Sequence, residues 1–412
     1  MTFLRLLLLV GTAGLVTSTA FLLLVVIASL RFRRGSTRAM RSPEELPPVT
    51  LLKPLCGLEP GLEEHLTSFF EQHYPAYEII FGTRNSDDPA LGIVRQISQR
   101  HPSVPVKIVF SGEPWRPNAK VCSLVKMYRQ AAHDYLVISD SDVRVGPNYI
   151  AEVVEPLLDA KNGMVTCLYR GLPTGGLWSK LEALGMSVEM TAGAIVANLM
   201  EGMKFALGPT MAIRRDALEA VGGLEPLAEY CADDYELGRK VAESGRQVVM
   251  SRYVIDHVVI NRRFACSMRH QIRWMKSTRF SRQAGHAGTA LTFAMPFGLV
   301  AMLAACALHH WELGIGLFAL AYFNRVLLSI AAGGSVVRDP RALRMAWLYP
   351  VRDLMGFAFW CASYWGSGIN WRGDWYRLQS GGRMVLAHPG SSRVPETVAR
   401  TEVLPASVTV DR

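Results

Sequence analysis

The feature that most constrains this chain is an uncharged run near its beginning. Residues 6–30 contain no acidic or basic side chain, and about 20 apolar residues in a helix suffice to cross the ~30 Å hydrocarbon layer of a bilayer. A cleaved signal peptide is the alternative, but its apolar core is usually only about 7 to 15 residues long. We therefore expect residues 1–31 to form an uncleaved membrane anchor.

Basic residues follow this run directly and indicate which side of the membrane the chain occupies. Only Arg5 precedes the run, whereas five arginines follow it: Arg31, Arg33, Arg34, Arg38 and Arg41. Since positive charge stays on the cytoplasmic side, we expect the following domain in the cytosol, at the cell (inner) membrane. The net charge of +9 fits a surface that binds anionic head groups. No motif of a nucleic-acid-binding module accompanies it.

The cysteines agree with a cytosolic location. The chain has seven, spread singly and without the C-x-x-C pairs of zinc or redox sites: Cys56, Cys122, Cys167, Cys231, Cys266, Cys306 and Cys361. Disulfides do not persist in the cytosol, so we expect reduced packing residues.

Short apolar runs alternate with helical stretches between residues 48 and 165. The strand candidates are 49–55, 77–83, 106–112, 135–142 and 164–169, and the helix candidates are 62–73, 88–101 and 120–133. This repetition predicts an α/β fold with a mainly parallel sheet and helices on both faces. In such sheets ligands bind beyond the carboxyl ends of the strands.

The composition becomes membrane-like again after residue 288. Residues 289–308 and 313–334 predict a hairpin of two spans, whereas 354–369 is shorter and could cross, re-enter or lie in the interface. The apolar stretch 176–205 could be a core helix or a surface against the bilayer. The expected domains are an anchor at 1–31, a cytoplasmic domain at 42–287, membrane helices at 288–370 and a disordered tail at 385–412.

Two aspartates end the strand candidate at 135–142. Asp140 and Asp142 lie two residues apart, so they share one face or converge where the strand enters its loop. Two like charges this close repel each other unless a cation lies between them, and oxygen ligands suit Mg²⁺ or Mn²⁺. A solvated acidic turn is the alternative, but the position at a strand end favours a metal site.

Two other acidic pairs stand before helical stretches. Asp88 could cap a helix that begins at Pro89, which leaves Asp87 free to bind a ligand. Asp233 and Asp234 precede a helix that ends near Gly245. One of this pair is enough for a cap, and the other could serve as a general base.

A basic segment precedes the predicted membrane hairpin. Residues 269–282 carry five basic side chains and could simply form an interfacial helix. Arg273 and Trp274 suggest more, because a guanidinium can hold a diphosphate through two hydrogen bonds and an indole can line a sugar site.

Together these stretches resemble the ceramide glucosyltransferase family of membrane glycosyltransferases and its bacterial relatives, including the hopanoid-pathway glycosyltransferases. The matching segments are TLLKPLCGLEPGLEEHL, TRNSDDPA, PNAK, ISDSDVRVGPNY, VTCLYRG, GPTMAIRRDAL, GGLEPLAEYCADDYELG and HQIRW. They run from about residue 47 to 285. The resemblance implies the GT-A fold of nucleotide-sugar transferases, with a mixed, mainly parallel sheet.

The resemblance also implies roles for single residues. Nucleotide-sugar binding would involve Lys53, Asp87, Asp88, Lys120, Asp140 and Asp233. Asp140 with Asp142 would hold Mg²⁺ or Mn²⁺, although relatives often carry Gly at the position of Asp142.

The remaining implied roles are catalytic. Asp234 would be the general base, and Arg273 with Trp274 would belong to a Q/R-x-x-R-W signature that braces the leaving diphosphate and the acceptor. The chain departs from this signature at His270, which replaces Gln or Arg. A histidine could still donate to a phosphate, with a pH dependence that Gln lacks.

The implied reaction is an inverting transfer of glucose or N-acetylglucosamine from a UDP-sugar to a lipid hydroxyl, such as that of ceramide or a hopanoid. One alternative is a processive polysaccharide synthase of the cellulose or hyaluronan kind, although such enzymes use a channel of several spans. Another is a membrane protein that binds sugar nucleotides without catalysis, but the chain has all the expected acids.

Overall fold

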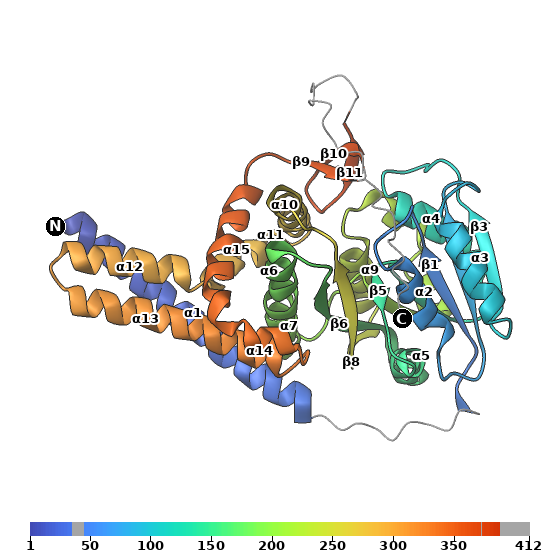
Figure 1. Cartoon of the computed structure of the whole chain (residues 1–412), viewed down its shortest axis with the longest axis horizontal. Coiled ribbons are helices and arrows are strands. Elements are labelled where there is room, and N and C mark those ends of the chain that lie inside the picture. Colours follow the sequence, from blue (N-terminus) through green and yellow to red (C-terminus); the bar gives the residue numbers. More distant parts are fainter. Residues whose placement is uncertain (35–44, 372, 388–412) are drawn as a thin grey trace, which may run out of the picture.

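The chain combines a bundle of apolar helices with an α/β domain, shown in Figure 1 as a computed structural model. The structure describes residues 1–34, 45–371 and 373–387. Arg38, Arg41, the expected domain boundary at residue 42 and residues 388–412 of the expected tail lie outside the described residues.

A mixed sheet of eight strands forms the centre of the α/β domain, in the order β3-β2-β1-β4-β7-β6-β8-β5. Strands β3, β2, β1 and β4 run parallel, as the sequence predicts. Beyond them β7 is antiparallel to both β4 and β6, β6 is parallel to β8, and β5 is antiparallel to β8. The strands are β1 (Val49–Pro54), β2 (Tyr77–Thr83), β3 (Val106–Phe110), β4 (Tyr135–Ser139), β5 (Val143–Arg144), β6 (Asn162–Pro173), β7 (Thr210–Arg214) and β8 (Gln247–Val259).

Alternation along the central strands produces two apolar layers. Leu51 and Ile79 point into the layer with α2 and α3, whereas the next residues, Leu52 and Ile80, point into the layer with α4. This period of two is the strand geometry that the sequence pattern requires. The helices around the sheet are α2 (Leu62–Phe70), α3 (Ala90–Arg100), α4 (Ala119–Tyr128), α5 (Tyr149–Val154), α8 (Arg215–Ala220) and α9 (Asp233–Glu243).

Within the described ranges, three helices are long and apolar enough to cross a membrane: Thr2–Arg34, Leu177–Glu201 and Trp311–Gly334. The first is α1, and the third comprises α13 (Trp311–Leu328) and a π-helical turn. The predicted span at 289–308 is not one straight helix. It breaks between Gln283–Thr292 and α12 (Met295–Ala307), with a bend of 49°. Helix α12 packs against both α1 and α13 (Figure 1).

Pro296, which has no backbone N–H to donate, and a buried ion pair together account for this break. The Asp353 carboxylate accepts hydrogen bonds from the backbone N–H groups of Ala294 and Met295, at 3.0 and 2.8 Å, and so caps the start of α12. Arg325 donates to the same carboxylate at 3.1 Å and to the Thr292 carbonyl at 2.9 Å. The freed backbone groups at the bend are thereby satisfied.

The remaining helices connect the bundle to the α/β domain. The stretch 176–205 forms α6 (Leu177–Gly185), a π-helical turn (Met186–Met190) and α7 (Thr191–Glu201). Helix α10 (Phe264–Ser281) packs against α15 (Tyr349–Ser363), which contains most of the ambiguous stretch 354–369. Among the described residues, α15 is not one of the span candidates. The short helices are α11 (Gln283–Thr289) and α14 (Pro340–Arg344).

A second sheet lies where the sequence predicts only an interfacial segment and a tail. It consists of β9 (Gly368–Trp371), β10 (Asp374–Leu378) and β11 (Met384–Leu386). Because β11 includes residues 385 and 386, the prediction of disorder from residue 385 is wrong at its start. The Cys231 N–H donates to the Gly382 carbonyl at 3.0 Å, so this sheet holds the loop that leads into α9.

We predict that Gly238→Ala destabilises the α/β domain, because α9 packs too closely on the loop between α7 and β7 to accept a methyl group. A Cβ at Gly238 would lie 2.3 Å from the Ala206 nitrogen and 2.4 Å from the Phe205 carbonyl carbon. Overpacking against backbone costs about 1 to 3 kcal/mol, so the apparent melting temperature in detergent should fall. Gly92→Ala in α3 is the matched control, since its Cβ meets nothing within 4 Å. An equal response of both variants would contradict this packing.

Candidate active site

The turn after β4 carries the first two candidate residues. Strand β4 ends at Ser139, so Asp140 and Asp142 lie in the turn that leads to β5 rather than within the predicted strand. The side chain of Lys53, on β1, holds this turn in place. Its buried ammonium donates to the Asp140 carbonyl at 2.6 Å and to Ser139 Oγ at 3.4 Å. Burial lowers the pKa of Lys53 to about 7, and the charge of Asp140 opposes this effect.

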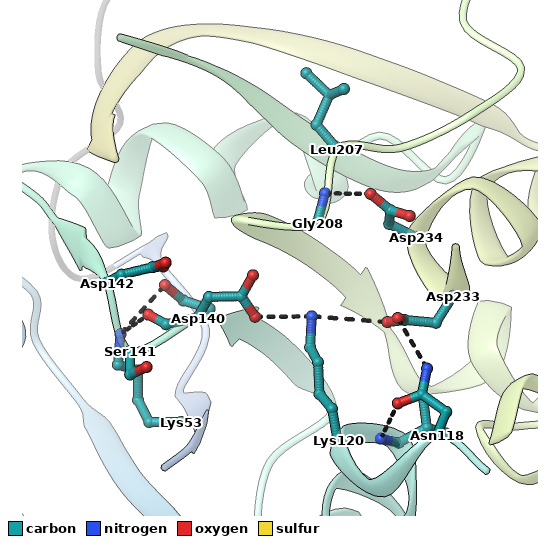
Figure 2. Close-up of polar contacts among 12 residues, drawn as sticks. Lys53, Asn118, Lys120, Asp140, Ser141, Asp142, Leu207, Gly208, Asp233 and Asp234 are labelled. Atoms are coloured by element: carbon teal, nitrogen blue, oxygen red, sulfur yellow. Dashed lines mark hydrogen bonds and ion pairs between the residues drawn. The ribbon is translucent and has the colours of Figure 1, made fainter. Parts of the chain in front are cut away.

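Lys120 connects this turn to the start of α9. Its Nζ lies 2.7 Å from Asp140 Oδ1 and 3.7 Å from Asp233 Oδ2, and Figure 2 shows it between the two carboxylates. Burial alone would lower the pKa of Lys120, but Asp140 and Asp233 outweigh burial and raise it. Lys120 is therefore a permanent cation between two acids that would otherwise repel each other.

Asn118 fixes Lys120 and α9 relative to each other. Its side-chain oxygen caps α4 by accepting from the Val121 N–H at 3.1 Å. Its side-chain nitrogen donates to the Tyr230 carbonyl at 2.9 Å and to Asp233 Oδ1 at 3.1 Å. One amide thus satisfies groups on both helices.

Asp234 points away from this cluster, toward the loop before β7 (Figure 2). Its carboxylate accepts from the Gly208 N–H at 2.7 Å and from the Tyr235 N–H at 2.8 Å. The close approach requires a glycine, since a Cβ at Gly208 would lie 3.0 Å from Asp234 Oδ2. Burial first, and then the charge of Asp233, raise the pKa of Asp234 to about 6. A carboxylate with this pKa can accept a proton near neutral pH.

The carboxylates of the β4–β5 turn fit a divalent cation. Asp142 Oδ1 is buried without a hydrogen-bond partner in the described part of the chain, and Asp142 Oδ2 lies 3.7 Å from His257 Nε2 on β8. Within the described ranges, no three His, Cys, Asp or Glu side chains are grouped closely enough to hold a metal by themselves. Two carboxylates nevertheless suit Mg²⁺ or Mn²⁺ when substrate phosphates complete the coordination shell.

Helix α10 carries His270, Arg273 and Trp274 and lies beside the β4–β5 turn. The His270 and Trp274 rings lie 4.3 Å apart, and Trp274 also contacts the His257 ring at 6.5 Å between ring centroids. The Arg273 guanidinium lies over the Trp371 ring of β9 at 5.6 Å. Because His257 contacts both Asp142 and Trp274, the structure brings α10 close to the acidic turn.

A buried glutamate orients His270. Glu182 on α6 is only 1 % exposed, and its carboxylate accepts from Asn261 Nδ2 at 3.0 Å and from Ser267 Oγ at 2.5 Å. It also lies 2.6 Å from His270 Nδ1. An Nδ1–H bond to a carboxylate fixes the tautomer and leaves Nε2 as the atom that can contact a ligand.

This hydrogen-bonded group continues to α15 and to the π-helical turn after α6. Gln271 Nε2 donates to Ser267 Oγ at 2.9 Å, and Arg352 on α15 donates to Gln271 Oε1 at 2.6 Å. The Arg352 guanidinium also binds Glu189, in the π-helical turn after α6, at 3.0 Å. The orientation of α10 therefore depends on α6 and α15.

Asp87 and Asp88, the acidic pair predicted after β2, differ in their contacts. Asp88 is committed to the protein, because its carboxylate accepts from the Ala90 N–H at 2.9 Å and from the Gly57 N–H at 3.0 Å. Helix α3 begins at Ala90, one residue later than predicted. Asp87 is exposed, and in the described part of the chain its side chain has no hydrogen bond or ion pair.

Sequence reasoning missed three residues at the site. Glu182 and His257 gave no signal, because their partners are distant in the sequence. Tyr169 on β6 is buried close enough to Asp234, Asp142 and Asp140 for their charges, after burial, to raise its pKa. Its segment VTCLYRG belongs to the resemblance, which was the only signal that could have indicated it.

Comparison with known proteins identifies the family of this chain. Residues 14–384 match a family described as Glycosyl transferase family 21. Ceramide glucosyltransferase 1 of Caenorhabditis elegans is 24% identical over 359 residues, which cover 86% of this chain and 76% of the worm protein. Ceramide glucosyltransferase 3 of the same organism is 22% identical over 390 residues, which cover 92% and 83% of the two chains.

A solved structure shares the architecture. It is a mannosyltransferase from Pyrobaculum calidifontis in complex with GDP-Man and Mn²⁺, with a TM-score of 0.52 and 18% identity. The similarity covers 87% of this chain and 99% of the other. It confirms the predicted GT-A fold.

Proposed function

Since this chain belongs to glycosyl transferase family 21, together with the ceramide glucosyltransferases, we propose that it transfers glucose from UDP-glucose to the hydroxyl group of a ceramide-like membrane lipid. Sugar transfer follows from the family. The donor and the acceptor are the proposed part, supported above all by the match of residues 14–384, which includes both acidic turns and α10. An assay must distinguish this reaction from two alternatives, in which the donor is UDP-N-acetylglucosamine or the acceptor is a hopanoid.

Asp234 acts as the general base in this proposal. It stands at the N-terminus of α9, where backbone N–H groups hold its carboxylate in place. Its raised pKa of about 6 lets it take the proton of a lipid hydroxyl while it is itself ionised at neutral pH. The hydroxyl oxygen then attacks the anomeric carbon with inversion.

The β4–β5 turn binds the donor diphosphate. Asp140 and Asp142 would hold Mg²⁺ or Mn²⁺, which when bound offsets the negative charge of the leaving diphosphate. Lys120 keeps Asp140 and Asp233 near each other. Lys53 positions the Asp140 backbone through a hydrogen bond to its carbonyl. Exposed Asp87 is available to bind the nucleoside. The neighbouring Asp88 braces the loop that carries Asp87.

Helix α10 completes the site from the membrane side. Arg273 carries the positive charge that can stabilise the departing diphosphate, and Trp274 lines the sugar and acceptor region. His270, fixed through Nδ1 by Glu182, presents Nε2 to the same region. Asp142, His257 and Trp274 lie next to one another, which supports assigning them to one site.

The same proposal fixes the orientation in the membrane. Helices α1 and α13 cross the inner membrane, and the α/β domain lies on the cytoplasmic side, where UDP-sugars are available. A lipid acceptor keeps its tail in the bilayer, so the active site has to stand at the membrane surface. Helices α6, α10 and α15 connect that surface to the acidic turns.

Labelled UDP-glucose tests the transfer directly. Membranes that contain the protein, supplied with ceramide and Mn²⁺, should form a labelled lipid that extracts into organic solvent. Asp234→Asn should lower the rate by about 10² to 10⁴, because it removes the general base. Asp159→Asn, on an exposed turn, is the control and should leave the rate unchanged.

Three outcomes would count against the proposed reaction. Labelled insoluble polymer instead of lipid would indicate a processive synthase. Labelling only from UDP-N-acetylglucosamine, or only with a hopanoid, would replace the donor or the acceptor. Full activity in Asp234→Asn would remove Asp234 from its role.

The rate of transfer should fall as the pH drops below about 6, because the protonated Asp234 carboxyl cannot accept a proton. The charge of Asp233 is the second cause of the raised pKa, so Asp233→Asn should move the acid limb to lower pH. The measurement is kcat against pH at saturating UDP-glucose. An acid limb at the same pH in both proteins would show that another group controls it.

A further inference from the structure

A cavity of ≈280 Å³ lies between the end of α1 and the α/β domain. Three elements enclose it: the last turns of α1, helix α7 and strand β8. Its lining residues are Ala28, Arg31, Phe32, Ile195, Asn198, Leu199, Met250 and Arg252. We call it the α1–β8 cavity. Helix α1 packs against α7 along this side of the molecule (Figure 1).

The cavity lies at the depth of the lipid head groups. Residues 6–30 are uncharged and extend about 38 Å at 1.5 Å per residue, which exceeds the ~30 Å hydrocarbon layer. Arg31 is the first charged residue after this run, so its guanidinium stands where the acyl chains give way to phosphates. This step rests on the membrane placement of α1 proposed above.

Two arginines in the cavity have no partner among the residues that the structure describes. In the described part of the chain, neither Arg31 nor Arg252 makes a side-chain hydrogen bond or an ion pair, whereas neighbouring Arg33 donates to Ser335 Oγ at 3.1 Å. Arg31 is exposed and Arg252 is half-buried. Two cations that face one cavity repel each other unless an anion lies between them.

The rest of the lining is apolar and identifies the anion as part of an amphiphile. Ile195 is buried, and Phe32, Leu199 and Met250 are half-buried around the arginines. A small free anion would leave this apolar wall unused. A phospholipid would use both parts, with its phosphate between the guanidinium groups and its chain against the apolar residues.

We propose that the α1–β8 cavity binds the phosphate head group of an anionic membrane phospholipid. Such a lipid ties the anchor to β8, which carries Met250 and Arg252 in the cavity and His257 beside Asp142. The bound lipid therefore sets how the α/β domain stands on the membrane. This is a binding site separate from the donor and acceptor sites.

Native mass spectrometry of the full chain tests this proposal without any sugar donor. The protein is released from nanodiscs of phosphatidylcholine mixed with phosphatidylglycerol, and the retained lipids are counted. Wild type should retain one phosphatidylglycerol in preference to phosphatidylcholine. Loss of both charges in the double variant Arg31→Gln, Arg252→Gln should weaken this binding about 30-fold. Arg34→Gln, at the same end of α1 but outside the cavity, should retain the lipid.

Single Arg252→Gln repeats the test if the double variant does not fold, and should show a smaller loss. Equal retention by wild type and the folded cavity variant would overturn the proposal. So would an equal loss in Arg34→Gln, which would indicate only a general surface charge. Displacement of the lipid by inorganic phosphate would show a simple anion site and would likewise contradict it. Because lipid retention is read without sugar transfer, an inactive enzyme does not affect the result.

Discussion

The site depends on one cation between two acids from different elements. Asp140 follows β4 and Asp233 begins α9, and their charges would drive these elements apart. The Lys120 ammonium, 2.7 Å from Asp140 and 3.7 Å from Asp233, holds them together. Asn118 fixes the start of α4, from which Lys120 projects, against α9. This arrangement leaves Asp142 and Asp234 outside the ion pair.

Helix α15 reaches the same site through buried polar groups. Arg352 on α15 binds Gln271 on α10, and Gln271 contacts Ser267, which donates to Glu182. Such groups are costly in an apolar surrounding unless each finds a partner. Their pairing therefore specifies one angle between α10 and the bundle. A lipid-linked acceptor would then meet Trp274 and Asp234 in a fixed position relative to the bilayer.

Local patterns in the sequence predicted much of this structure, and distant contacts account for what they missed. Short apolar runs between helical stretches predicted β1 to β4, and like charges at a strand end indicated Asp140 and Asp142. Strands β7 and β8 depend on antiparallel and long-range pairing that no local period reveals. Asp353, 58 residues after Met295, caps the start of α12. Glu182 contacts His270, which lies 88 residues later in the chain. Neither of these two contacts belongs to a local motif, so the sequence could not predict them.

We propose above that Asp140 and Asp142 hold a divalent cation together with the donor diphosphate. Electron paramagnetic resonance of Mn²⁺ measures this directly, since the signal of free Mn²⁺ falls as the ion binds. We predict that the wild-type protein binds Mn²⁺ more tightly when UDP is present, and that Asp142→Asn loses most of this binding because one of two carboxylate ligands is gone. If Mn²⁺ binds equally well with and without UDP, and equally well to Asp142→Asn, the proposed metal site is wrong.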